Sequence, residues 1–252
     1  MSPPAPESPL TCAARAVVRT TPPGAVMRVG QESAAGSGPA YPRRDACLRE
    51  IAPLFSDELV VTNVARTAFE WHMAHPGEGN LYTMGMGLVT PVALGLALAL
   101  PRRRVVALDG DGGILLNLGV LATVANHPAP NLVSIIFDNE SYASTGGLPT
   151  ATAGRTDLAA VARAVGIESV WTTDMLEGTR AALAGIFADG DRAGAAVLVV
   201  KVSSETPPVA PKLMDGRENK YRFVRHIEAT EGITVLRPSA VGRRAEGVSL
   251  DA

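Results

Sequence analysis

The sequence has few of the residues that would place it in a specialised class of protein. Only two cysteines occur, Cys12 and Cys47, which are too few for a disulfide framework or a cysteine-rich metal cluster. The formal net charge is -2 over 252 residues, which gives no reason to expect nucleic acid or a membrane surface as a partner. The sequence shows no internal repeat and no long apolar leader at its start. These features predict a reduced, cytoplasmic location.

Hydrophobic residues are plentiful, although aromatic residues are scarce. They make up 46% of the chain, which is enough for one large α/β domain or two small ones. Residues 1–43 are rich in Pro, Ala, Gly and Ser, a composition that buries too little apolar area to offset its ordering entropy. We therefore expect a poorly ordered tail over 1–43, a folded domain over 44–237 and a second tail over 238–252.

The segment from Gly79 to Pro101 contains no charged residue and precedes Arg102–Arg104. Its length would suit a membrane span with a basic flank. Asn80, Pro91 and several glycines interrupt it, however. We expect instead a short helix over about Thr90–Leu100, buried against a parallel sheet, and no membrane insertion.

The stretch from Arg103 to Thr150 has the pattern of a strand–helix–strand unit. The apolar run Val105–Leu108 predicts a buried strand, and the glycine-rich segment after it predicts a tight turn. A helix is expected over about Ile114–Asn126, ending at the prolines that follow. A second buried strand is expected over Leu132–Phe137. Ligands of open parallel sheets bind at the carboxyl ends of the strands, where this unit places its polar residues.

Those polar residues suit a metal-bridged diphosphate. Gly112 and Gly113 would expose backbone N–H groups at a helix N-terminus, where anions are favoured. Asp111 would repel a phosphate by itself, but a bound Mg²⁺ reverses that effect. Asn139 follows the second strand and offers a neutral carbonyl oxygen as a further ligand. A magnesium site that holds a diphosphate is therefore the predicted chemistry.

Three other interpretations of Asp109–Gly113 were weighed. An EF-hand loop would place a bidentate Glu at its twelfth position, where the chain has Val120. A dinucleotide fingerprint needs Gly-x-Gly-x-x-Gly, and the third glycine is missing after Gly110 and Gly112. A plain structural turn remains possible, although it leaves Asn139 without a role.

The rest of the sequence alternates between expected helices and strands. Short connections in such an order imply a parallel sheet with right-handed crossovers. The predicted fold is therefore an α/β, doubly wound parallel sheet with helices on both faces. The further expected helices are Asp45–Leu54, Val64–Ala74, Asp157–Val165, Met175–Phe187 and Tyr221–Glu228, and the further strands are Leu59–Thr62, Ser169–Trp171 and Ala195–Val202.

At this point the residues show a resemblance to a known family. Gly110-Asp111-Gly112, with Asn139 after a helix and a strand, resembles the metal–diphosphate motif of thiamine diphosphate enzymes. Asp138-Asn139-Glu140 followed by Ser144-Thr145-Gly146-Gly147 resembles phosphonopyruvate decarboxylases and the β subunits of sulfopyruvate decarboxylases. Leu81–Leu88 is similar to the segment that holds the aminopyrimidine in these enzymes. The resemblance covers about Asp45–Val224, and its three motifs occur in the expected order.

The resemblance implies a thiamine diphosphate-binding fold, specifically its diphosphate domain, with thiamine diphosphate and Mg²⁺ as cofactors. It also implies which residues bind them. The metal ligands would be Asp111, Asn139 and the main-chain oxygen of Ser141. The diphosphate and its surroundings would be contacted by Gly110, Asp111, Gly112, Gly113, Asn139, Ser141, Thr145 and Gly146. The pyrimidine would meet the carbonyl of Tyr82 and the side chain of Met84, which holds the cofactor bent, with Met86 as the alternative.

Enzymes of this type use a second α/β domain that binds the pyrimidine and supplies a catalytic Glu. This chain has the sequence of one domain, so the resemblance implies a half-enzyme with no catalytic side chain of its own. It would form a heteromer of α2β2 or larger composition with a pyrimidine-domain subunit. The implied reaction is non-oxidative decarboxylation of a small 2-oxo acid to an aldehyde. A carboligase of the acetolactate synthase type and a non-catalytic cofactor-binding module are the alternatives.

Overall fold

The structure is a computed structural model that describes residues 41–64, 66–205 and 215–236. Within residues 41–205, six parallel strands form one sheet in the order β2-β1-β3-β4-β6-β5. The chain divides after Lys212 into two units, and each is described by itself. The strands are β1 (Leu59–Asn63), β2 (Asn80–Met84), β3 (Val105–Gly110), β4 (Leu132–Asp138), β5 (Ser169–Thr173) and β6 (Ala196–Lys201).

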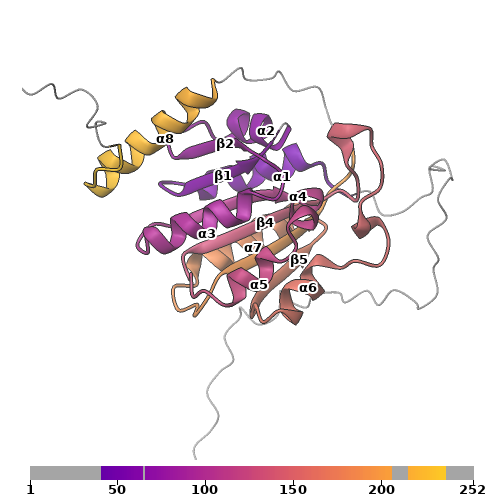
Figure 1. Ribbon diagram of the computed structural model, residues 1–252. Helices are drawn as coiled ribbons and strands as arrows, with labels where there is room; N and C mark the ends of the chain where they lie inside the picture. The colour runs from indigo at the N-terminus through magenta and orange to yellow at the C-terminus, as the bar shows by residue number, and fades with distance from the viewer. Residues whose placement is uncertain (1–40, 65, 206–214, 237–252) are drawn as a thin grey trace, which may run out of the picture. The chain divides into compact units, whose positions relative to one another are not determined.

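Helices cover both faces of the sheet (Figure 1). α3 (Val89–Ala99), α5 (Val120–Ala125) and α6 (Leu158–Ala164) pack on one face. The other face carries α1 (Arg44–Ile51), α2 (Arg66–Ala74) and α7 (Leu176–Ala188). Every residue of β1 and β4 is buried, as expected for strands covered on both sides. The predicted doubly wound α/β fold is confirmed.

The strand–helix–strand unit differs from the prediction in its helical part. β3 and β4 occur where expected and run slightly further. The single helix predicted over Ile114–Asn126 is wrong, because α4 (Asp111–Leu116) and α5 are separate short helices. The break lies at Asn117, whose φ of -140° is not helical. Its Nδ2 donates to the Gly87 carbonyl at 2.9 Å, so a contact to a distant segment replaces continuation of the helix.

The uncharged segment forms a strand and a short helix. β2 lies at the edge of the sheet and pairs with β1. α3 has 11 residues and packs on the sheet as expected, but only one of its faces is buried, and Leu98 on the other is exposed. Among the described residues, no helix combines the length and apolar character that crossing a membrane requires.

Two helix starts differ in detail from the expectation. Asn63 ends β1, and α2 begins at Arg66, two residues later than the expected start at Val64. Asp157 is the N-cap of α6, where its side chain accepts hydrogen bonds from the N–H groups of Ala159 and Ala160. The other predicted elements occur with small shifts at their ends. The described part of the chain also contains three single-turn 3₁₀ helices, η2 (Ala52–Leu54), η3 (Ala143–Thr145) and η4 (Ala151–Ala153).

The second unit contains α8 (Gly216–Glu231), which includes the helix predicted over Tyr221–Glu228. Its N-cap is Asp215, whose side chain accepts from the N–H groups of Arg217 and Glu218. Nearly all of the two expected tails lies outside the described residues. The expected domain limits, 44 and 237, therefore stay predictions.

Candidate functional site

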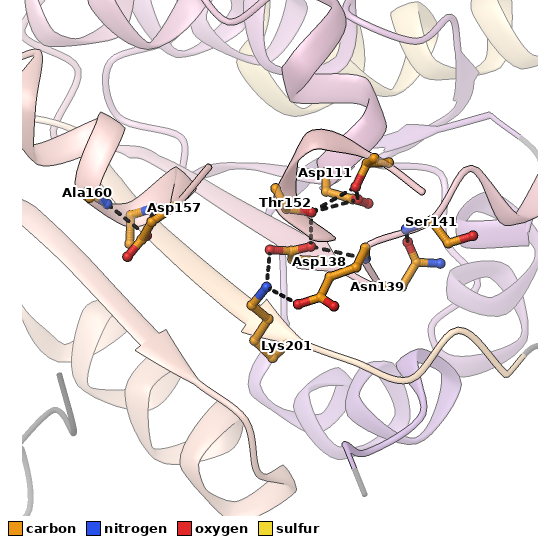
Figure 2. Close-up of polar contacts among 11 residues, drawn as sticks. Asp111, Asp138, Asn139, Ser141, Thr152, Asp157, Ala160 and Lys201 are labelled. Atoms are coloured by element: carbon orange, nitrogen blue, oxygen red, sulfur yellow. Dashed lines mark hydrogen bonds and ion pairs between the residues drawn. The ribbon is translucent and has the colours of Figure 1, made fainter. Parts of the chain in front are cut away.

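The carboxyl ends of β3, β4 and β6 lie side by side and gather a group of polar side chains (Figure 2). Gly110 pairs with Phe137 in the register of β3 and β4. Asp138 pairs with Lys201 in the register of β4 and β6. The chain also reverses its direction of travel across the sheet here, because β2 and β3 lie on opposite sides of β1. Such a switch point is where open parallel sheets bind ligands.

The turn after β3 requires its two glycines. α4 begins at Asp111, so the N–H groups of Gly112 and Gly113 belong to the first helical turn, which lacks intrahelical acceptors. A Cβ on Gly112 would lie 2.6 Å from Cε1 of Tyr142. A Cβ on Gly113 would overlap Oδ1 of Asp109. Only a residue without a side chain therefore fits at either position.

Asp109 supports this turn from inside the sheet. Its Oδ1 accepts hydrogen bonds from Asn63 Nδ2 at 2.9 Å and from the Gly110 N–H at 2.9 Å. Its Oδ2 accepts from the Thr90 hydroxyl at 3.3 Å. Burial raises the pKa of Asp109 to about 6. The sequence analysis gave Asp109 no separate role, and only the fold shows that Asn63 and Thr90 are its partners.

Asp111 is also buried, with 3% of its surface exposed, but neutral hydroxyl groups hold its carboxylate. Thr150 donates to Oδ2 at 2.6 Å, and the Thr152 hydroxyl oxygen lies 3.2 Å from the same oxygen. Burial raises the pKa of Asp111 above its ordinary value, and the nearby Asp138 carboxylate adds to the rise. A cation bound there would relieve both effects.

Thr152 and Lys201 connect Asp111 to a second buried acid, Asp138. The Thr152 hydroxyl lies 2.7 Å from Asp138 Oδ1, and Lys201 Nζ lies 2.8 Å from Asp138 Oδ2. Lys201 Nζ also lies 2.8 Å from Glu140 Oε1. Figure 2 shows this network, which extends from the end of β6 to the first residue of α4. The sequence analysis missed Thr150, Thr152 and Lys201, because no spacing rule links them to Asp111.

Asn139 and Ser141 lie on the turn that follows β4, at the same edge of the sheet as Asp111 (Figure 2). Asn139 Oδ1 accepts from the Ser141 N–H at 3.3 Å. Between them, Glu140 adopts a φ of 59°, a left-handed conformation that is unfavourable for a residue with a side chain. The structure thus brings together the three residues that were predicted as metal ligands.

The next segment is a narrow loop closed by a bridge between Ser141 and Pro149. Thr145 and Gly146 lie at its exposed end, and Gly146 has a φ of 106°. Both were predicted to contact the cofactor, and this stays a prediction. Tyr142, at the base of the loop, lies against Gly112. Tyr142 is therefore a site residue that the sequence analysis did not single out.

The segment predicted to hold the pyrimidine begins on β2. Tyr82 is 5% exposed, and its hydroxyl contacts Asn80 Nδ2 at 2.8 Å and His72 Nδ1 at 3.1 Å. Met84 ends the strand. The methyl carbon of Met86 lies 3.4 Å from the position of a Cβ on Gly112. Of the two methionines considered as the wedge, Met86 is therefore the one that the structure places beside the glycine turn.

Two histidines, His72 on α2 and His75 just after it, pack against aromatic side chains. His72 contacts Tyr82, and His75 packs against Trp71 with ring centroids 5.1 Å apart. Within the described residues, no three His, Cys, Asp or Glu side chains are grouped so that they could hold a metal ion. A metal at the carboxyl edge would therefore depend on amide and main-chain oxygens in addition to Asp111.

Comparison with known proteins gives matches that span most of this sheet. Residues 62–200 match the family described as "Thiamine pyrophosphate enzyme, C-terminal TPP binding domain". The chain is 35% identical to the sulfopyruvate decarboxylase β subunit of Methanothermobacter thermautotrophicus, over 75% of this chain and 97% of that protein. It is 36% identical to the corresponding β subunit of Methanocaldococcus jannaschii, over 54% of this chain and 73% of that protein.

A longer relative and a solved structure give the same result. The chain is 40% identical to the phosphonopyruvate decarboxylase of Streptomyces hygroscopicus, over 64% of this chain but only 40% of that protein. The benzoylformate decarboxylase structure from Polynucleobacter necessarius aligns with a TM-score of 0.55 and 19% identity, over 66% of this chain and 34% of that one. At this identity the structural likeness concerns the fold alone.

The family match covers more than half of the chain, and it includes β2 to β5, the end of β1 and all of β6 except Lys201. The sheet, the glycine turn and the matched family thus agree on one assignment. This chain belongs to the thiamine pyrophosphate enzymes and contains their C-terminal TPP-binding domain.

Proposed function

We propose that this chain is the diphosphate-binding subunit of a two-component, thiamine diphosphate- and Mg²⁺-dependent decarboxylase of 2-oxo acids. The observation that carries the proposal is the 35% identity to a sulfopyruvate decarboxylase β subunit over 97% of that protein. The match extends over nearly the whole of that β subunit, which supports the role of a β subunit for this chain. Phosphonopyruvate decarboxylase relatives support the same substrate class.

The residues at the carboxyl edge fit both groups of the cofactor complex. Gly112 and Gly113 leave their amides accessible where any Cβ would clash, and amides at a helix start suit a diphosphate. Asp111, Asn139 and the main-chain oxygen of Ser141 are hard oxygen ligands of the kind that Mg²⁺ prefers. Burial raises the pKa of Asp111, and a cation bound beside it would favour the charged carboxylate.

Each of these residues has a defined task in the proposal. The thiazolium ring of the bound cofactor supplies the electron sink for decarboxylation. Thr150 and Thr152 hold the Asp111 carboxylate in one orientation. Met84 is expected to keep the cofactor bent, with Met86, whose methyl carbon lies beside the glycine turn, as the alternative. This chain therefore binds and orients the cofactor, whereas proton transfer to the pyrimidine needs a carboxylate from elsewhere.

We expect that carboxylate on a partner chain. The relatives named as β subunits support a heteromer in which an α subunit provides the pyrimidine domain and its catalytic Glu. The 2-oxo acid would then react at the interface of the two chains. An acidic group at the far end of the substrate, such as a phosphonate or sulfonate, is the chemistry that these relatives suggest.

Carboligation is the second candidate. An acetolactate synthase large subunit from Parasynechococcus marenigrum is 31% identical, but the match covers only 24% of that protein. The smaller share of that relative makes this the weaker alternative. Incubation of the assembled enzyme with a 2-oxo acid would separate the two, because decarboxylation releases an aldehyde and ligation gives an acetohydroxy acid.

The metal site is tested by Asp111→Ala. We expect this variant to lose Mg²⁺-dependent retention of thiamine diphosphate, because alanine has no oxygen that could bind the metal that holds the diphosphate. The exposed Asp191 provides a matched control, and Asp191→Ala should retain the cofactor as the wild type does. Retention by Asp111→Ala equal to that of wild type would show that the site is assigned wrongly.

The partner is tested by a pull-down of the full chain from its native extract, with Mg²⁺ and thiamine diphosphate present. We expect mass spectrometry to identify a second chain of roughly 150–200 residues, about one domain, together with the cofactor. Recovery of this chain alone and without cofactor would contradict the two-component enzyme and favour a binding-only role.

A further inference from the structure

Lys201 ends β6 and contacts the turn that carries two of the proposed metal ligands. Its Nζ lies 2.8 Å from both Asp138 Oδ2 and Glu140 Oε1. The distance between the Lys201 and Asp138 side chains is short because the two residues are partners in the register of β4 and β6. Burial lowers the pKa of Lys201, but its hydrogen bonds to the two carboxylates more than offset this and leave the pKa raised. The ammonium group is therefore a fixed cation of the folded chain.

Glu140 is the residue that this cation holds. Its N–H donates to Asp138 Oδ1 at 3.2 Å, and its carbonyl accepts from the Thr150 N–H at 3.1 Å. Its carboxylate pairs with Lys201. A left-handed backbone at a residue with a side chain persists only where the surroundings impose it. Lys201 contributes twice, directly to the Glu140 side chain and through Asp138 to its amide.

The conformation of Glu140 determines how its two neighbours are presented. Asn139 precedes it and Ser141 follows it, so a change in φ at Glu140 would turn one proposed ligand relative to the other. Figure 2 shows Lys201 below this turn and Asp111 on its other side, linked through Asp138 and Thr152. The same network thus contacts Asp111 and the turn that carries Asn139 and Ser141.

We propose that Lys201 is a positioning residue for the divalent cation: through Glu140 and Asp138 it fixes the turn that presents Asn139 and Ser141, and it thereby lowers the Mg²⁺ concentration needed for cofactor binding. The inference rests on the proposed function. Nothing in it requires Lys201 to touch the metal, the cofactor or the substrate.

A purely electrostatic role would have the opposite sign. An ammonium group close to a cation site repels the cation, so its removal would tighten Mg²⁺ binding. Loss of a positioning contact would weaken Mg²⁺ binding, and residues that orient metal ligands typically contribute about 10- to 100-fold to metal affinity. The direction of the change therefore distinguishes the two roles.

The experiment uses the full chain in complex with the partner recovered by the pull-down. Thiamine diphosphate is held at a fixed concentration, Mg²⁺ is titrated, and protein-bound cofactor is measured after rapid filtration. We expect Lys201→Met, which keeps the length of the side chain, to raise the half-saturating Mg²⁺ concentration at least about tenfold, with full binding restored by excess Mg²⁺. Lys201→Arg keeps the charge and should recover part of the loss.

Two further variants test the inference in case Lys201→Met does not fold. Lys201→Met leaves Asp138 buried without its cation, which could unfold the chain. Glu140→Gln breaks the other ion pair at a residue that is 40% exposed at its side chain, and it should shift the Mg²⁺ requirement in the same direction by a smaller factor. The double change Lys201→Met with Asp138→Asn removes the buried charge of Asp138 together with its partner and should also raise the Mg²⁺ requirement.

The controls separate failure of this inference from failure of the proposed function. Arg102→Met removes an exposed cation that precedes β3, at the opposite edge of the sheet, and should leave the titration unchanged. If the folded Lys201 variants and Glu140→Gln bind with unchanged or lower Mg²⁺ requirement while Asp111→Ala loses binding, the inference is wrong and the metal site stands. If Asp111→Ala also has no effect, the metal site itself is wrong.

Discussion

Asp109 and Asp111 are separated by one glycine, yet their side chains have different surroundings. Asp109 points into the sheet, where Asn63, Thr90 and the Gly110 amide hold it. Asp111 begins α4 and contacts hydroxyl groups at the carboxyl edge. Alternation along a strand would point residues two apart to the same face, so the difference arises because β3 ends at Gly110 and α4 begins at Asp111, which changes the direction of the side chain. One acid therefore supports the turn, and the other is available for a ligand.

The pH dependence of stability tests the burial of Asp109. Its pKa is about 6 in the folded chain and about 4 in an unfolded one. The folded state therefore holds this proton more tightly, so the contribution of Asp109 is fully present below about pH 4 and is lost as the pH rises to about 6. Asp109→Asn replaces the carboxyl group by a neutral amide of the same shape. The variant therefore does not lose stability in this way as the pH rises.

Between pH 4 and pH 7, we expect the wild type to lose up to about 3 kcal/mol of unfolding free energy relative to Asp109→Asn. Urea unfolding at several pH values, without Mg²⁺ or cofactor, measures it. The other carboxylates contribute to both proteins and cancel in the comparison. A difference that does not change with pH would contradict the raised pKa.

The glycine turn gives a second prediction for single residues. Gly113→Ala should lower the unfolding free energy by about 1–3 kcal/mol, because the new methyl group overlaps the buried carboxylate of Asp109 and meets Asn63 Nδ2. Gly119→Ala is the control, since a Cβ there has no atom within 4 Å and the backbone φ is -59°. Equal effects of the two substitutions in urea unfolding would show that crowding does not explain the glycine at 113.

At the level of elements, the helix starts show how local sequence sets each boundary. α6 has a side-chain cap, because Asp157 Oδ1 lies 2.9 Å from the Ala159 N–H and 3.0 Å from the Ala160 N–H (Figure 2). α7 follows Met175, which provides no side-chain cap. An acceptor at the N-cap replaces hydrogen bonds that the first helical turn cannot make internally.

Asp157→Ala should therefore cost about 1 kcal/mol of unfolding free energy, measured by urea unfolding monitored by circular dichroism. Asp157→Asn retains an acceptor oxygen and should cost clearly less. If alanine and asparagine at this position behave alike, the cap contributes little and the packing of α6 on β5 and β6 sustains the helix start.

At the level of the molecule, the strand order decides which residues meet. β6 lies between β4 and β5. Lys201 therefore contacts Asp138, although the chain forms β5 and two connections between these two residues. β1 lies beside β3, which places Asn63 next to Asp109. Sites at the carboxyl edge of a parallel sheet are thus assembled from segments that are distant along the chain.

Ligand binding should stabilise the assembled molecule as a whole. With its partner present, Mg²⁺ and thiamine diphosphate at 100 times their dissociation constant should add about 2.7 kcal/mol of stability and raise Tm by several degrees, roughly 2–4 °C per kcal/mol for a chain of this size. Thermal unfolding with and without both ligands measures the shift. Asp111→Ala should show almost none of it, and an equal shift in that variant would contradict the proposed metal site.

The sequence alone determined the class of fold and the identity of the main loops. Apolar runs such as Val105–Leu108 and Leu132–Phe137 predict strands that are buried on both faces. The residues of the glycine turn are specified locally, because Gly112 and Gly113 are needed wherever a backbone must approach other groups closely. Motifs of this kind depend on neighbours in sequence, and they can be identified without coordinates.

Only the tertiary structure decided the break at Asn117, the partners of the acids and the role open to Lys201. Asn117 leaves the helix because its side chain reaches Gly87, a contact that helix propensity cannot foresee. Thr150, Thr152 and Lys201 meet Asp111 and Asp138 through the order of the strands and a folded-back loop. The physical reason is the same in each case: these contacts join residues that are far apart in the chain, so their geometry exists only once the sheet has formed.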